Sequence, residues 1–480
     1  MLENSIYFEN CISNHTWTLP SHNIVFSGLY TTQIKKIGGK LYDIIPKVPL
    51  LTELLEDEGY YTLCFTENPW INPFFNNTRG FKTYIKNFRR SFYIFENEKV
   101  KLLIERIFNF LAYNIVGKIK ISLFHYYFEL IENLVNKTVK FLLFNLFWKK
   151  WLLEYKNTLK MMDKLFISLK KKTKNNPYYL FLNIMATHYP YIPTKDILEK
   201  FDLKAKKLKN LKPLFLNPIK FFTERNFAQK KLSKTQLSSL NKLYNSTVFH
   251  SDLIIGRIIE NLRKNNLLKD TYIIITSDHG EHLCLATDHY LYGHGVSHSA
   301  FEGLIKVPLI IYHEKLKKKI IRNQVQLKDL YHTIIDLSEI NLDNAIYNRE
   351  SSILYQIDND LTPEYIFGEH LKRKKKLKNS VINHHKNLNH QLKKKVLYNL
   401  YFLRSQNYKY MNYENKVEEL YNLNKDPFEQ TNIIDKNPII YKKMKGYFNE
   451  YLRKLNHPNK IIEKLTKNEM DLINRVLRKR

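Results

Sequence analysis

Cysteine is scarce in this chain of 480 residues. The three cysteines, Cys11, Cys64 and Cys284, lie far apart, and no CxxC pair occurs. A disulfide framework and a zinc knuckle both depend on several suitably spaced cysteines. The sequence therefore predicts neither of these two kinds of site.

Long apolar runs, glycine-serine linkers and internal repeats are also missing. No run of about 18 residues is free of charged and polar side chains, so we predict no membrane-spanning helix. Residues 1–20 lack the basic and then apolar layout of a signal peptide. These absences leave the localisation open, and the chain as written is expected in the cytoplasm.

Acidic residues are few relative to basic ones. The 46 Asp and Glu residues stand against 77 Lys and Arg, which gives a formal net charge of +31. Such an excess attracts nucleic acid, anionic lipid or an acidic polymer, but a solvated lysine-rich surface has the same composition. Few aromatic residues interleave the lysine runs. We therefore expect no specific nucleic-acid partner, while peripheral contact with an anionic membrane stays open.

The chain contains enough apolar sequence, 44% of its residues, for a large folded core. Apolar runs of strand length are predicted strands at residues 178–184, 272–276 and 307–312. A long amphipathic helix is predicted at residues 237–267. Strands that alternate with helices predict an α/β fold, a doubly wound mixed sheet flanked by helices.

Two stretches depart from this alternation and suggest a division into domains. Residues 84–176 have a helical, aromatic and basic character, and we expect them to form an insertion into a catalytic domain of residues 1–345. The run at 139–155 within it either packs on its own domain or lies on a membrane surface. Residues 346–480 are expected to form a C-terminal subdomain, with an exposed loop at 372–395, an antiparallel hairpin from 396 and a terminal helix.

Charged and metal-binding side chains follow the predicted strand at 272–276. Asp278, His279 and Glu281 lie where this strand ends, in "SDHGE", and a "GHG" sequence follows. Ligand sites of open α/β sheets gather at the carboxyl ends of strands. A carboxylate and an imidazole side by side can both bind a divalent metal. A solvated turn would explain the same residues, but the preceding strand favours the metal site.

Two further positions could bind or attack an anion. His188 follows the predicted strand at 178–184 and precedes two prolines that stiffen its loop. Thr18 lies next to a predicted helix start, with Pro20 in the first turn and Gly28 just past the end. The backbone N–H groups at a helix N-terminus favour an anion such as a sulfate or phosphate ester. Thr18 is either a nucleophile toward that anion or a simple cap residue.

Four sequence blocks together resemble the sulfatase branch of the alkaline-phosphatase-like superfamily. In chain order they are "YFENCISNHTWTLPSHNIVFSGLY", "FLNIMATHYPYIP", "DTYIIITSDHGEHL" with "YGHGVSHSAFEGLIKVPLIIY", and "EELYNLNKDPFEQTNI". The resemblance covers nearly the whole chain apart from residues 84–176. It implies the alkaline-phosphatase-like fold and chemistry on sulfate or phosphate esters, with a glycan or a lipid headgroup as candidate substrates.

The resemblance also implies a role for individual residues. Thr18 falls on the nucleophile, and Asp278 and His279 fall on metal ligands, with Thr18 beside the same ion. His188 and His294 fall on two substrate-contacting histidines, and His298 competes with His294 for the second position. One divalent metal ion is implied, calcium in the first place, with manganese, magnesium or zinc as alternatives.

The chain departs from the family pattern in two ways. Sulfatases carry Cys or Ser at the nucleophile, converted to formylglycine, and Arg four residues later, whereas this chain has Thr18 and His22. Threonine cannot form formylglycine, but it is the nucleophile of related transferases. The family also begins with a buried strand that ends in acidic metal ligands, some forty or more residues ahead of the nucleophile, and this chain starts at about the point where that unit has finished. We expect a metal site short of negative charge and a sheet with incompletely paired edges.

Two functions therefore stay open. The first is a metal-dependent hydrolase or transferase acting on sulfate or phosphate esters, with Thr18, His188 and His294 as catalytic residues. The second is an inactive sulfatase-like scaffold that binds an anionic polymer or membrane surface through its lysine runs. Metal dependence would favour the first, and binding that falls steeply with salt would favour the second.

Overall fold

The computed structural model describes most of the chain, and the structural statements below concern that part. The described residues are 2–37, 44, 48–87, 161–173, 176–191, 193–203, 208–211, 213–214, 218–228, 230–295, 299–340, 346–371, 394–396 and 398–456. Most of the predicted insertion at 84–176, most of the loop at 372–395, and His298 lie outside these ranges. Strand β3 (Thr83–Lys86) occupies the first residues assigned to the insertion, so the helical prediction is wrong there.

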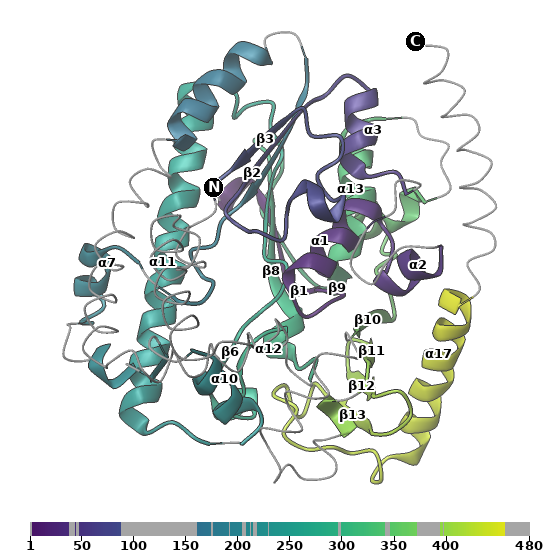
Figure 1. Ribbon diagram of the computed structural model, residues 1–480. Coiled ribbons are helices and arrows are strands. Elements are labelled where there is room, and N and C mark those ends of the chain that lie inside the picture. The colour runs from purple at the N-terminus through teal and green to yellow at the C-terminus, as the bar shows by residue number, and fades with distance from the viewer. Residues whose placement is uncertain are drawn as a thin grey trace, which may run out of the picture.

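Two sheets form the centre of the molecule (Figure 1). The first has the strand order β5 (Ile273–Thr276), β8 (Lys306–Tyr312), β1 (Ser5–Ile12) and β9 (Lys319–Gln326). Because β1 pairs antiparallel with β8 and parallel with β9, this sheet is mixed. The second sheet is parallel, with β2 (Tyr61–Thr66) between β3 and β4 (Tyr178–Asn183). The three predicted strands are confirmed as β4, β5 and β8.

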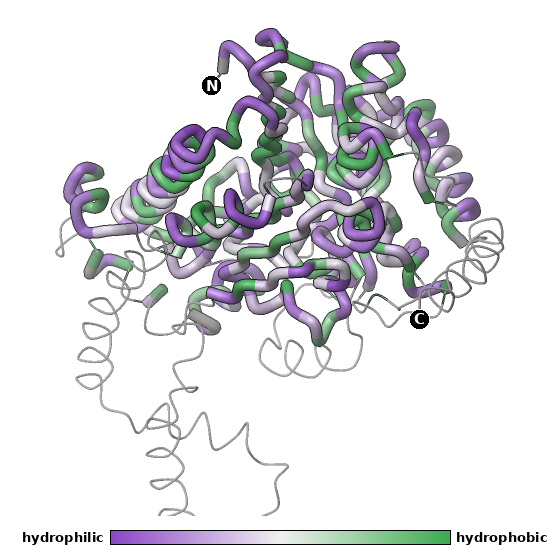
Figure 2. Tube along the Cα trace, turned by 90° about the horizontal axis from the view of Figure 1, so that it is seen from above, coloured by the Kyte–Doolittle hydropathy of each residue, from purple (hydrophilic) through white to green (hydrophobic). Residues whose placement is uncertain are grey.

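Helices cover both faces of these strands. Helix α11 (Lys234–Lys264) packs on one face, and α1 (Thr18–Ser27), α3 (Leu51–Asp57) and α13 (Leu330–Leu337) pack on the other (Figure 1). Alternate residues of β4 serve the two layers, since Tyr179 and Phe181 face the α1 side while Leu180 and Leu182 face α11. Figure 2 shows many of the hydrophobic residues in the interior of the trace and many of the hydrophilic ones on its outer turns. The predicted doubly wound α/β fold is therefore confirmed.

The main sheet is interrupted between β4 and β5. Among the described strands, each of these two is an edge, β4 of the parallel sheet and β5 of the mixed sheet. Both strands border one hydrophobic cluster, to which Leu180 and Ile273 contribute, and the Tyr178 hydroxyl hydrogen-bonds Thr271 Oγ1 just ahead of β5. Both strands are apolar, yet most of their residues are only half-buried. This matches the expectation of incompletely paired edges.

The C-terminal part forms a separate four-stranded antiparallel sheet. Its order is β10 (Ile366–His370), β11 (Leu400–Arg404), β12 (Tyr408–Asn412) and β13 (Glu418–Asn422). Helix α17 (Pro438–Asn456) packs on it (Figure 1). The predicted hairpin and terminal helix are therefore confirmed. A buried ion network joins this sheet to the main domain, with Lys409 Nζ 3.1 Å from Glu302 Oε1 and Arg404 also bound to Glu302.

Shorter elements complete the described fold. They are α2 (Thr31–Lys36), α7 (Lys195–Lys200), α10 (Pro218–Asn226), α12 (Glu302–Ile305), α14 (Ile353–Asp358), β6 (His282–Leu283) and β7 (Tyr292–Gly293). None of the described helices combines the length and the apolar character needed to cross a membrane.

Candidate active site

Thr18 is the first residue of helix α1. The residue before it, Trp17, is the N-cap and forms no side-chain cap hydrogen bond. Gly28 ends the helix with a φ of 68°, as the predicted helix asymmetry requires. Instead of capping the helix, the Thr18 hydroxyl lies 3.2 Å from Nε2 of His279. The interpretation of Thr18 as a cap residue is therefore wrong, and its hydroxyl is directed at a candidate ligand.

The turn after β5 brings Asp278 and His279 to this hydroxyl. Ser13 Oγ, which follows β1, donates to the Asp278 carbonyl oxygen at 2.6 Å and ties the two strand ends together. The glycine of the "SDHG" sequence is required by packing, because a Cβ on Gly280 would come within 2.1 Å of the Gly303 carbonyl oxygen. The "SDHG" motif and the close approach of the backbone at Gly280 to that at Gly303 therefore place the side chains of Asp278 and His279 beside Thr18.

His22 is the partner of Asp278 that the sequence did not indicate. Its Nδ1 lies 3.6 Å from Asp278 Oδ2 and donates to the Thr18 carbonyl oxygen at 2.8 Å. The ring is buried and packs edge-on against Phe181 of β4. His22 is one helical turn beyond Thr18, so the spacing of four residues is the signal that places it on the same face. The residue that replaces the family's arginine therefore lies at the site.

His188 and His294 also reach the site from their separate loops. The His294 ring lies 4.1 Å from the ring of His279 and 4.9 Å from that of His188, between centroids. Glu281 Oε1 accepts a hydrogen bond from His294 Nδ1 at 2.9 Å. The structure thus brings together all the predicted site residues that it describes, and Glu281 orients one of them.

The four histidines share one hydrogen-bonding pattern. Each ring donates from Nδ1 to an oxygen atom: His22 to Thr18, His188 to Tyr189 at 2.6 Å, His279 to Gly280 at 2.8 Å, and His294 to Glu281. These oxygens assign the proton of each neutral ring to Nδ1. Nε2 is then the atom that accepts a hydrogen bond or binds a metal.

Burial and neighbouring charges shift the pKa values of these groups. Burial lowers the pKa of His188 and that of His294 to about 4, so both rings are neutral at pH 7. Burial alone would raise the pKa of Asp278, but the neighbouring histidines and the Thr18 hydroxyl outweigh it and hold this pKa at about 2. Burial raises the pKa of Glu281. At neutral pH the site therefore combines an ionised Asp278 with neutral imidazoles.

The donor atoms at Thr18 fit part of a metal site. Asp278 Oδ2 lies 3.5 Å from His279 Nε2, which in turn lies 3.2 Å from Thr18 Oγ1. Donors that share one small ion at about 2.1 Å are separated by about 3.4 Å in a tetrahedral site. Among the described residues, however, no three His, Cys, Asp or Glu side chains converge on one point. One carboxylate with one imidazole suits zinc or manganese better than calcium, which takes six or more oxygens.

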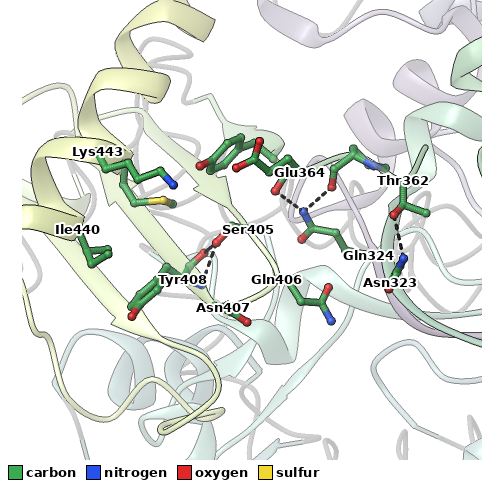
Figure 3. A pocket seen from close by; sticks show the side chains of 13 residues that line it. Asn323, Gln324, Thr362, Glu364, Ser405, Gln406, Asn407, Tyr408, Ile440 and Lys443 are labelled. Carbon is green, nitrogen blue, oxygen red and sulfur yellow. Dashed lines mark hydrogen bonds between the residues drawn. The ribbon is translucent and has the colours of Figure 1, made fainter. Parts of the chain in front are cut away.

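A pocket of about 420 Å³ lies away from this site, between the main domain and the C-terminal sheet (Figure 3). Gln324 from β9, Tyr408 from β12 and Lys443 from α17 are among its lining residues. Gln324 Nε2 donates to the carbonyl oxygens of Pro363 and Glu364, so this amide holds the wall of the pocket. None of the residues around Thr18 lines this pocket. It lies where the mixed sheet meets the C-terminal sheet and helix α17.

The sequence profile of the Sulfatase family matches residues 1–340. Arylsulfatase K of Canis lupus familiaris is 27% identical over 310 residues, which cover 59% of this chain and 53% of that protein. The chain thus spans about half the length of the curated relatives it matches.

Two solved structures have a similar fold at low identity. BT4656 in complex with its substrate D-glucosamine-2-N,6-O-disulfate superposes with a TM-score of 0.61 at 16% identity, over 96% of this chain and 93% of that one. The phosphonate monoester hydrolase SpPMH from Silicibacter pomeroyi gives 0.60 at 14% identity, over 94% and 88%. Because the profile covers more than two thirds of the sequence, with the same architecture in these structures, the chain belongs to the Sulfatase family.

Proposed function

We propose that this chain hydrolyses sulfate or phosphate monoesters and that Thr18 is its nucleophile. The observation that carries the proposal is the contact of the Thr18 hydroxyl with His279 Nε2 at the N-terminus of α1. The helix N-terminus supplies backbone N–H groups for the ester anion, and two neutral histidines stand beside it. The named relatives and neighbours include an arylsulfatase, a sugar sulfate complex and a phosphonate monoester hydrolase, which supports the same reaction class.

In the first step the Thr18 oxygen forms a bond to the sulfur or phosphorus atom. The bond from that atom to the ester oxygen breaks, and the leaving alcohol takes a proton from His188 or His294, whose pKa values a bound anion would raise. Because Nε2 of His279 would hold a divalent ion, the Thr18 proton would pass to solvent water rather than to this nitrogen. In the second step water attacks the same sulfur or phosphorus atom, which releases sulfate or phosphate and restores the Thr18 hydroxyl. No oxidation occurs and no aldehyde is needed.

One divalent ion is part of this proposal. Asp278, His279 and Thr18 would hold it, and when bound it would lower the pKa of the Thr18 hydroxyl and polarise the ester. The donor set favours zinc or manganese, while calcium stays the expectation from the family resemblance. Transfer of the group to an acceptor other than water uses the same first step, and the product would distinguish it from hydrolysis.

A panel of sulfate, phosphate and phosphonate monoesters tests the proposal. We expect Thr18→Ala to lower kcat/KM by about a thousandfold or more, because it removes the attacking atom. Thr31→Ala is the matched control, since Thr31 is the first residue of the next helix and is equally buried. Unchanged turnover in Thr18→Ala would overturn the assignment.

The inactive scaffold is the second candidate, and the interrupted sheet between β4 and β5 is the observation that favours it. In that case no ester would be turned over. Binding to heparin or to anionic vesicles would then fall steeply with salt and would not respond to metal ions.

A further inference from the structure

The short helix α12 lies between the mixed sheet and the C-terminal sheet (Figure 1). Leu304 and Ile305 of this helix are fully buried in one apolar cluster with Ile12 at the end of β1 and Phe402 of β11. A single helical turn has little stability of its own, because helix formation begins with an unfavourable nucleus. The position of α12 must therefore come from its contacts with the neighbouring parts of the molecule.

The C-terminal end of α12 holds the turn that carries Asp278 and His279. Carbonyl oxygens at this end accept hydrogen bonds from the backbone N–H of Gly280, at 2.8 Å, and from that of Ser13, at 2.6 Å. Gly280 directly follows His279 in the chain. The Ser13 hydroxyl in turn donates to the Asp278 carbonyl oxygen at 2.6 Å. A shift of α12 would therefore displace both candidate metal ligands.

The N-terminal end of α12 is held by a buried ion cluster of the C-terminal part. Lys409 Nζ of β12 lies 3.1 Å from Glu302 Oε1 and donates to the Ala300 carbonyl oxygen at 2.7 Å, just ahead of the helix. Glu429 accepts from the Glu302 backbone N–H through Oε2 at 2.6 Å, and its Oε1 lies 2.5 Å from Lys409 Nζ. Arg404 of β11 donates to the Glu302 carboxylate through Nε and Nη2. Three side chains of the C-terminal part therefore fix the start of α12.

Stability alone is a poor explanation for this ion cluster. Lys409 is fully buried and Glu429 is 1% exposed. Taking such charges out of water is costly, and well-packed apolar residues of similar size often give an equally stable protein. Burial alone would raise the pKa of Glu302, but Lys409 and Arg404 outweigh it and hold this pKa at about 2. The charged partners supply a defined geometry, because each ion pairs with particular atoms of α12.

We propose that Lys409 and Glu429 are positioning residues for Asp278 and His279, acting through helix α12. The inference rests on the proposed function, because it gives the C-terminal sheet a part in building that same site. An ion cluster that only joined the two parts of the molecule would change the stability of the protein. It would leave the turn after β5 as it is.

The test replaces an ion pair by a neutral pair, so that no buried charge is left without its partner. Lys409→Met with Glu429→Gln removes the two positioning residues. Lys395→Met with Glu419→Gln is the matched control, because it removes another largely buried Lys–Glu pair of the C-terminal part, on β13 rather than on α12. Circular dichroism first establishes that both double variants are folded.

Two measurements are then made on the full chain. Hydrogen exchange of residues 277–283 should be at least about tenfold faster in Lys409→Met with Glu429→Gln, while residues 61–66 of β2 exchange as in wild type. The dissociation constant for zinc or manganese should rise roughly tenfold, as it typically does when a partner that orients a metal ligand is removed. The control variant is expected to stay within about twofold of wild type in both measurements.

The outcomes separate this inference from the proposed function. Unchanged exchange at 277–283, or faster exchange of all peptides by the same factor, would overturn the positioning role. Faster exchange at 277–283 with an unchanged dissociation constant would overturn it as well. If wild type binds neither ion and turns over no ester, the proposed function fails. The exchange of residues 277–283 relative to 61–66 then decides the positioning role by itself.

Discussion

At the scale of single residues, hydrogen bonds fix the orientation of the side chains at the site. Thr18 points at His279 instead of capping its helix, and four imidazole rings have Nδ1 bound to an oxygen. Asp278 is the carboxylate between His22 and His279, with its Oδ2 3.6 Å and 3.5 Å from their ring nitrogens. Its pKa of about 2 keeps the carboxylate ionised at neutral and mildly acidic pH. Asp278 is therefore the residue on which metal binding should depend.

We expect Asp278→Asn to abolish stabilisation by a divalent ion. In wild type, one ion among calcium, magnesium, manganese and zinc should raise Tm, because a ligand that binds only the folded state stabilises it. Asp288→Asn is the control, since Asp288 is likewise a carboxylate near a histidine but lies by His282. An ion-specific shift of equal size in Asp278→Asn would contradict the assignment of Asp278 as a ligand.

The sequence identified most of these residues but not their partners. Asp278 and His279 could be predicted because they end a run of β-branched residues, and Thr18 because Pro20 and Gly28 bracket a helix. His22 enters the sequence pattern only as a departure from a family arginine. Its pairing with Asp278 joins residues that are 256 positions apart in the chain, and no local pattern encodes such a contact. The edge-to-face contact of Trp17 with Trp70, at 5.7 Å between ring centroids, could not be predicted for the same reason.

At the scale of elements, the interruption between β4 and β5 is the main feature. A strand at the edge of a sheet leaves every second backbone N–H and C=O without a ladder partner. Here two such edges among the described strands border one hydrophobic cluster, and their apolar residues stay half-buried. The strands themselves could be predicted from their apolar runs. Their neighbours could not, because a buried run looks the same whether its partner is parallel, antiparallel or absent.

Hydrogen exchange should reveal these edges. We expect backbone amides in 178–183 and 273–276 to exchange at least about tenfold faster than those in 61–66, since β2 is paired on both sides. Mass spectrometry of peptides from the three strands measures this. Protection of β4 and β5 equal to that of β2 would show that their outer edges are covered.

At the scale of the whole molecule, buried titratable groups link folding to pH. Burial lowers the pKa of both His188 and His294 from the ordinary 6.5 to about 4. Between these values the unfolded chain binds protons that the folded chain does not, so stability falls as the pH drops through this window. Glu429 works in the opposite sense, because burial raises its pKa and the folded chain keeps its proton to higher pH than the unfolded chain does.

We expect the histidines to dominate between pH 6.5 and pH 4. The free energy of unfolding should fall by at least about 2 kcal/mol over this range, and His188→Gln should lessen the fall. Urea unfolding of both proteins at a series of pH values measures the effect. A fall of the same size in His188→Gln would show that His188 titrates alike in the folded and unfolded chain.

The C-terminal subdomain is the part of the architecture that the sequence predicted most completely. Its hairpin and terminal helix follow from local patterns, apolar alternation around a polar turn and a long amphipathic run. Its attachment through Lys409, Arg404 and Glu302 could not be predicted, because single charged residues in a strand more often face solvent. The proposed boundary near residue 345 remains a proposal about domains.

During turnover, the Thr18 oxygen should become bonded to the sulfur or phosphorus atom of the ester. Peptide mass spectrometry after rapid acid quenching of the enzyme with a substrate ester detects this bond. We expect one sulfuryl or phosphoryl group on the peptide that contains Thr18, and none in Thr18→Ala. Turnover with an unlabelled Thr18 peptide, or with the group on another residue, would contradict it.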